Sequence, residues 1–209
     1  MGAYHDRVRH CYRPHRLLRM GSLETTAAIH AAQWLAAYHR RFPHVDLSLH
    51  TGTTDDLVQR VLDRTLDAAF IAGDIDHPDI ARREVAVEDL RIVTASDCNW
   101  PSAVRGPEVV TVTFRQGCTY RRYLEDWLID RGVIRIRVME CGSVEAILQL
   151  VSAGLGITLM PKAVVEPLST RIASKSHPLG MNNGRIATYL ILQAYSSQDS
   201  HSNHHNHRC

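Results

Sequence analysis

Apolar residues in the first half of the chain alternate between the spacing of a strand and that of a helix. Residues 17–21 form a short apolar strand, and the apolar positions after it recur at helical spacing up to a proline. Residues 45–52 alternate with a period of two, as in a half-buried strand, and residues 55–66 return to helical spacing. Residues 67–73 and 90–96 predict two further strands. This β-α-β-α-β order predicts a parallel sheet with right-handed crossovers.

The second half of the chain repeats this plan. Strand, helix, strand, helix and strand follow in turn at residues 109–114, 120–128, 136–140, 143–153 and 156–161. In the first of these helices, Arg121 and Arg122 lie opposite the apolar stripe, which predicts a solvated face. Residues 185–193 add a last strand without a helix of its own, which is best placed by returning to the first lobe. The pattern therefore predicts two α/β lobes.

Composition and charge narrow the class of protein. At 209 residues, with 44% hydrophobic and 22% charged residues, the chain suits one large globular domain or two small ones. A net charge of +2, counting the histidines as neutral, gives no indication of a nucleic-acid or membrane partner. No apolar run approaches the roughly 20 residues that cross a bilayer, and the N-terminus lacks the apolar stretch of a secretory signal. We therefore expect a cytoplasmic protein.

Neither the two ends of the chain nor the cysteines clearly indicate a metal site, a disulfide or a catalytic group. Residues 1–16 are basic and aperiodic, and residues 196–209 are polar and rich in histidine, so both ends are expected to be disordered. The tail histidines could hold a metal, but a solvated tail is favoured because no packed shell would fix them. Five widely spaced cysteines without a C-x-x-C motif predict free thiols. We expect neither a metal nor a cofactor.

A recurring corner is the most informative local feature. Four times a strand ends in glycine followed by a small hydroxyl or thiol residue, and a helix begins: Gly21-Ser22, Gly52-Thr53, Gly117-Cys118-Thr119 and Gly142-Ser143. Each corner alone could simply be a good helix cap. All four lie at the carboxyl ends of predicted parallel strands, where open α/β sheets bind ligands. Helix N-termini attract anions, so a shared site for a small anionic or carboxylate ligand is favoured.

Several of these stretches resemble the effector-binding domain of LysR-type transcriptional regulators. The resemblance is carried by residues 18–73, "FRQGCTYRRYLEDWL" (114–128), "SVEAILQLVSAGLGITLMP" (143–161) and "SHPLG" (176–180), and it covers about residues 17–193. It implies a type 2 periplasmic-binding-protein-like fold, in which two Rossmann-like subdomains are joined by two crossover strands. Subdomain I would comprise residues 17–95 and 173–195, and subdomain II residues 96–172. The crossovers are expected near residues 95–97 and 173–177.

The resemblance also implies a site and partners. A small-molecule effector would bind in the cleft between the lobes, and the candidate effector-binding residues are Ser22, Leu23, Thr53, Gln116, Cys118, Thr119, Tyr120, Gly142 and Ser143. The family's habit of side-by-side pairing implies a homodimer or homotetramer that uses the helix at 24–41 and the strand at 45–50. The family's winged helix-turn-helix should precede residue 17 but is not found there. We therefore expect operator DNA to be bound only through that missing domain, in an excised, truncated or stand-alone sensor.

Two alternatives remain open from the residues alone. The same fold carries solute binders and some enzymes, so a cytoplasmic small-molecule-binding protein or an enzyme is the alternative function. No metalloprotease, nucleophile-elbow, phosphate-loop or dinucleotide motif is present, which favours a protein without catalytic activity. Cys118 begins a helix next to two arginines, so a redox switch is a second hypothesis, although a plain pocket-lining thiol is favoured.

Overall fold

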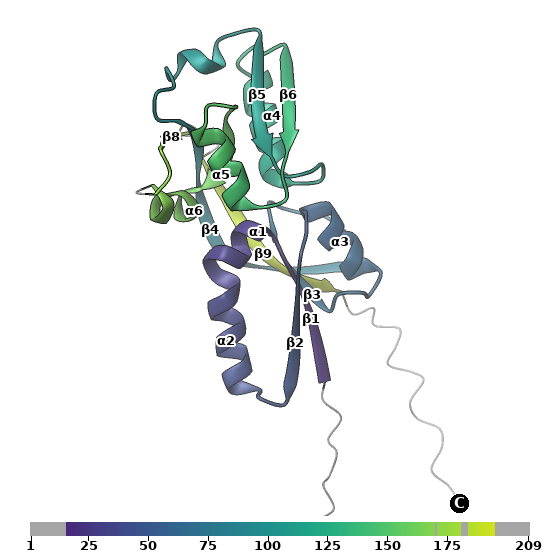
Figure 1. Ribbon diagram of the computed structural model, residues 1–209. Coiled ribbons are helices and arrows are strands. Elements are labelled where there is room, and N and C mark those ends of the chain that lie inside the picture. Colours follow the sequence, from purple (N-terminus) through teal and green to yellow (C-terminus); the bar gives the residue numbers. More distant parts are fainter. Residues whose placement is uncertain (1–15, 170, 181–183, 195–209) are drawn as a thin grey trace, which may run out of the picture.

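The computed structural model describes residues 16–169, 171–180 and 184–194. The predictions of disordered ends lie outside these residues, apart from Arg16, which begins the first strand. Two lobes follow one another along the long axis of the molecule, and one long strand, β4 (Ile80–Ala95), runs from one to the other (Figure 1). The α/β fold with two lobes is the one that the sequence predicts. No helix in the described part of the chain is long and apolar enough to cross a membrane.

The first lobe is built on a mixed sheet. Its strands lie in the order β2 (Val45–Thr51), β1 (Arg16–Ser22), β3 (Ala68–Ala72), β9 (Arg185–Gln193) and β4 (Ile80–Ala95). β1 pairs in parallel with both β2 and β3, whereas β9 is antiparallel to β3 and β4. The last strand of the chain therefore returns to the first lobe, as predicted.

Helices cover this sheet on both faces. One continuous helical stretch comprises α1 (Glu24–Thr26), a π-helical turn (Ala27–Ala31) and α2 (Ala32–Arg41), and it ends before Pro43 as the pattern predicts. On the other face lies α3 (Thr54–Leu62), which buries Leu57 and Val61 against the strands. None of the residues of α2 is buried. The α2 face of the first lobe is therefore covered much more thinly than the α3 face.

The second lobe repeats strand and helix. Its elements are β5 (Glu108–Thr113), α4 (Thr119–Ile129), β6 (Arg135–Glu140), α5 (Val144–Ser152), β7 (Thr158–Pro161), α6 (Lys162–Val165) and β8 (Ser174–Pro178). Short 3-10 turns at Ser102–Val104 and Glu166–Leu168 complete it. β5 and β6 pair in parallel, and a parallel bridge between Thr111 and Ile157 ties β5 to the chain that enters β7.

A single long strand, β4, connects the two lobes. Its residues up to Asp89 pair with β9, and those from Leu90 onward pair with β7 and β8. The change of partners along β4 falls between Asp89 and Leu90, and β8 pairs with the second half of this strand. The predicted crossovers near residues 95–97 and 173–177 and the lobe boundaries drawn from them stay a prediction. Sequence analysis missed the first half of β4 because half of its side chains are charged and most of its positions are exposed.

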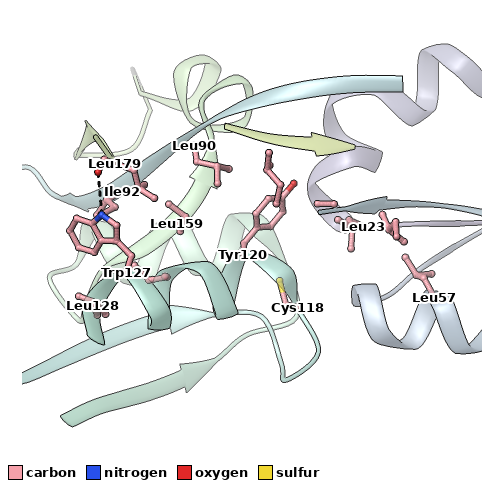
Figure 2. Close-up of a cluster of buried hydrophobic side chains, with 14 of the residues drawn as sticks. Leu23, Leu57, Leu90, Ile92, Cys118, Tyr120, Trp127, Leu128, Leu159 and Leu179 are labelled. Atoms are coloured by element: carbon pink, nitrogen blue, oxygen red, sulfur yellow. Dashed lines mark hydrogen bonds between the residues drawn. The ribbon is translucent and has the colours of Figure 1, made fainter. Parts of the chain in front are cut away.

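Of the three hydrophobic clusters among the described residues, the one with the most residues extends across both lobes. Leu23 and Leu57 from the first lobe belong to the same buried cluster as Leu124 and Trp127 on α4 and Leu90 on β4. In Figure 2, the labelled side chains of this cluster extend from Trp127 to Leu57, with Tyr120 and Cys118 in between. Burial of apolar surface therefore holds the lobes against each other as well as holding each one together.

Candidate functional site

A cavity of ≈ 340 Å³ lies between the two lobes. Its volume is near the lower end of the range of small-molecule sites in proteins, about 300–1,000 Å³. The first lobe lines it with Leu23, Glu24, Thr25, Thr51, Gly52 and Thr53. The second lobe lines it with Phe114, Arg115, Cys118, Tyr120, Glu140, Cys141 and Gly142. Each lobe thus supplies about half of the wall.

The four predicted corners converge on this cavity. They follow the carboxyl ends of β1, β2, β5 and β6, and a helix starts after each one. The Thr53 hydroxyl accepts a hydrogen bond from the Asp56 backbone N–H at 3.4 Å, which caps α3. Ser143 caps α5 in the same way, through the N–H of Ala146 at 3.2 Å. Since a capping hydroxyl uses an oxygen lone pair, the hydrogen of Thr53 is still available to a ligand in the cavity.

The predicted site residues divide into two groups. Those that line the cavity are Leu23, Thr53, Cys118, Tyr120 and Gly142. The others, Ser22, Gln116, Thr119 and Ser143, are not part of its lining. The hydroxyl of Ser22 is fully buried and donates to the carbonyl of Leu23 at 3.0 Å, whereas Gln116 and Ser143 are exposed. A direct role of these four residues in binding stays a prediction that the geometry does not favour.

Sequence reasoning missed several residues of the wall. They are Glu24, Thr25, Thr51, Phe114, Arg115, Glu140 and Cys141, and Gly52 was named only as part of a corner. All of them are close sequence neighbours of the corners, at a strand end, at a helix start or in the short connection between the two. Extending each corner by about two residues in both directions would have found most of them. Which neighbours face the cavity depends on how the lobes are packed. The local sequence pattern does not contain this information.

Polar contacts between the lobes surround the cavity. Thr25 Oγ1 donates to the Tyr120 hydroxyl at 3.4 Å, and Thr119 Oγ1 donates to Thr54 Oγ1 at 2.8 Å. The backbone N–H of Asp55 donates to the carbonyl of Gly117 at 3.3 Å. These contacts bridge the two lobes beside the cavity, and any separation of the lobes would have to break them.

The arginines near Gly117 have different surroundings. Arg115 lines the cavity, its side chain is 62% exposed, and it lies 3.8 Å from the Asp56 carboxylate across the lobes. Arg121 is only 16% exposed and pairs with Glu125 at 2.8 Å and with Glu140 at 2.5 Å. The prediction of a solvated face is therefore wrong for Arg121, because its side chain ties α4 to the end of β6.

The Cys118 thiol does not have the properties of a reactive cysteine. It is 5% exposed, and burial raises its pKa above the ordinary value. Backbone N–H groups at the start of α4 and the charges of Arg121 and Arg122 act in the opposite direction but do not outweigh burial. Since the thiolate is the reactive form, this environment disfavours the redox-switch hypothesis and favours a thiol that lines the cavity. Burial also raises the pKa of Tyr120, whose phenol is therefore neutral.

Within the described ranges, no group of three or more histidine, cysteine, aspartate or glutamate side chains is placed to hold a metal ion. The histidines of the tail lie outside those ranges. The chemical groups at the cavity are hydroxyls, thiols, backbone N–H groups and three charged side chains. Such a set suits the recognition of a small polar molecule.

Comparison with known proteins gives a family and a fold. Residues 13–199 match the LysR substrate binding domain family. The HTH-type transcriptional regulator GltR of Bacillus subtilis (strain 168) is 39% identical over 175 residues, which cover 83% of this chain and 59% of that protein. The HTH-type transcriptional regulator SoxR of Arthrobacter sp. (strain TE1826) is 37% identical over 187 residues, covering 90% and 63%. The chain thus spans about three fifths of these relatives.

Solved structures share the fold at low sequence identity. The reduced form of the regulatory domain of OxyR2 from Vibrio vulnificus superimposes with a TM-score of 0.70 at 19% identity, covering 88% of this chain and 89% of that one. Full-length CbnR in complex with its target DNA superimposes with a TM-score of 0.65 at 20% identity, covering 86% of this chain and 65% of that one. The two-lobed architecture is therefore that of known regulatory domains.

Proposed function

Because the chain belongs to the family of LysR substrate-binding domains, we propose that it senses a small effector in the cavity between its lobes on behalf of a transcriptional regulator. The observation that carries this proposal is the convergence of the four strand-end corners on one cavity lined by both lobes. An effector that contacts both walls stabilises the closed arrangement and shifts the population of lobe orientations.

We propose that the effector carries a carboxylate or another anionic group. The first N–H groups of α3, α4 and α5 lie at the corners, and free N–H groups at helix N-termini favour anions. Arg115 lines the same cavity, and its ion-pair partner among the described residues is Asp56 at 3.8 Å, which leaves donors free for a ligand. The relatives are named as regulators and not as enzymes, which supports a cytoplasmic binding protein without turnover.

Thr53→Ala is expected to weaken effector binding, whereas Ser143→Ala is expected to leave it unchanged. Both substitutions remove a helix cap and should lower the free energy of unfolding by about 1 kcal/mol. Only Thr53 lines the cavity, so only its loss removes a hydroxyl that faces the ligand. A thermal-shift screen of small carboxylates and metabolites identifies a ligand, because binding raises the melting temperature by mass action. Calorimetry on both variants then gives their affinities.

The outcome of this screen decides the proposal. If no small molecule stabilises the native chain, or if both variants bind a discovered ligand equally well, the cavity is not an effector site. Conversion of a bound compound into a product would instead favour the enzyme alternative.

We also propose that the chain pairs through α2 and β2. α2 buries none of its residues, and among the strands of the described residues β2 lies at the edge of the first-lobe sheet. Leu49 on β2 is 42% exposed, and Phe42 at the end of α2 is 43% exposed. An exposed apolar edge of this kind is typical of a surface that is covered in an assembly.

Leu49→Arg is expected to shift the protein toward the monomer, because a charge placed in an apolar interface must be desolvated. Leu155→Arg is the matched control, since Leu155 is 45% exposed but lies in the second lobe after α5. Sedimentation velocity at several concentrations measures the change. A wild-type chain that sediments as a monomer at all concentrations, or equal behaviour of both variants, contradicts this interface.

We propose contact with operator DNA only for the whole regulator. Such contact would require the part of the regulator that lies outside the matched region.

A further inference from the structure

The charges on the cavity wall do not suit a purely anionic ligand. Two carboxylates, Glu24 and Glu140, line the cavity together with a single guanidinium, that of Arg115. A ligand with negative charge alone would bring its charge next to two like charges, and each such approach is unfavourable in a partly desolvated site. The charges on the cavity wall therefore favour a ligand that carries a positive charge as well as a negative one.

The two carboxylates differ in their partners. Glu140 is already paired with Arg121 at 2.5 Å. The Glu24 carboxylate, in contrast, makes no hydrogen bond and no ion pair with any residue that the structure describes, although the backbone carbonyl of Glu24 accepts a bond within the helix. It is the first residue of α1, at the corner after β1, and its side chain is only partly exposed. Glu24 is therefore the carboxylate on the wall that is available to a ligand.

A simpler role for Glu24 is to stabilise the start of its helix, since acidic residues are favourable in the first turn. The same role fits Glu145, which lies in the first turn of α5, is exposed and does not line the cavity. If the two residues only stabilise the starts of their helices, substitution of either one should have the same effect, and this effect should not depend on which ligand is tested. A ligand-binding role predicts an effect for Glu24 alone.

The remainder of the wall is largely apolar. Leu23, Phe114, Cys118 and Cys141 lie among the charged groups, together with the ring of Tyr120. Arg115 and the corner N–H groups provide donors for a carboxylate, and Glu24 provides an acceptor for an ammonium group. We infer that the effector is a small zwitterion of the amino-acid type, whose ammonium group is recognised by Glu24. This inference rests on the proposed function, because it assumes that the cavity is the effector site.

Calorimetric titration of the whole chain with the proteinogenic L-amino acids tests this inference. The tightest binder is then compared with its 2-oxo acid and its decarboxylated amine, which keep the same side chain. We expect the amino acid to bind about tenfold more tightly than either analogue, since a hydrogen-bonded charge contributes about 1.5–3 kcal/mol. Glu24→Gln should weaken binding of the amino acid by about tenfold or more without weakening binding of the 2-oxo acid. Glu145→Gln should change neither affinity.

Two results would overturn the inference and leave the proposed function intact. One is a 2-oxo acid or other carboxylate that binds as tightly as its amino-acid counterpart in the wild-type chain. The other is an equal effect of Glu24→Gln on both ligands, which would indicate a role at the helix end. If no small molecule of any class binds, the proposed function fails, and the inference fails with it.

Discussion

Trp127→Ala is expected to lower the free energy of unfolding by about 3–5 kcal/mol. Trp127 lies on α4, is 4% exposed, and packs in the cluster that joins the two lobes. Its indole N–H donates to the carbonyl of Leu179 at 3.1 Å, a bond drawn in Figure 2. The alanine variant loses the buried ring and leaves that carbonyl without its donor. The Arg131 guanidinium, 3.7 Å from the ring centre, loses its contact as well.

Urea denaturation followed by circular dichroism measures this loss. Ile129→Ala is the matched control on the same helix, because Ile129 is 59% exposed and its truncation should change stability by less than about 0.5 kcal/mol. Trp127→Phe keeps a ring in the core and should fall between the two. Similar midpoints for Trp127→Ala and Ile129→Ala would show that α4 does not pack on the core in this way.

Gly117→Ala is expected to lower both stability and effector affinity. Gly117 has φ of +87°, a conformation that costs an alanine of order 1 kcal/mol or more. A Cβ at this position would also lie 3.0 Å from Thr53 Oγ1 and 3.1 Å from the Asp55 side chain, both in the opposite lobe. The added carbon would therefore press against the opposite lobe at the edge of the cavity and push the lobes apart. We expect an affinity loss of about tenfold, which corresponds to 1.4 kcal/mol.

Gly132→Ala is the control that distinguishes backbone strain from the steric contact between the lobes. Gly132 has φ of +84°, and no described atom lies within 4 Å of a Cβ added there. Both variants should therefore carry the strain, and only Gly117→Ala should lose affinity. Chemical denaturation measures the first effect, and calorimetry with a ligand found by the screen measures the second. Equal affinities of the two variants would mean that the cavity does not depend on the closed arrangement of the lobes.

Most elements of the fold could be predicted from periodicity alone. α4 was predicted from its apolar stripe, of which Tyr120, Leu124, Trp127 and Leu128 are buried and Tyr123 is half-buried; Thr119 is buried as well. The first half of β4 and the strand β8 were missed for the same reason. Both are rich in polar and charged side chains, and they are strands because other strands pair with their backbones. Pairing over such a distance in sequence leaves little trace in the local pattern of side chains.

The candidate site was predicted only in part. The corners were found because a helix start needs particular residues at particular positions, so its signal is local. Glu24 and Glu140 were not found, because an acidic residue near a corner has no signature until a cavity is seen beside it. The exposure of Arg121, and not its place opposite the apolar stripe, was predicted wrongly, because its second partner Glu140 belongs to another element. The charge balance of the cavity could therefore not be obtained from either lobe's sequence pattern.

The amino-acid sequence by itself determined the two α/β lobes, the capped corners at the strand ends and the return of the last strand to the first lobe. These features follow from residue spacing and from backbone groups that need local partners. Only the tertiary structure decided where β4 changes partners, which corner residues face the cavity and that Cys118 is buried enough to raise its pKa. Each of these depends on groups that are distant in sequence and are brought together by packing of one lobe against the other.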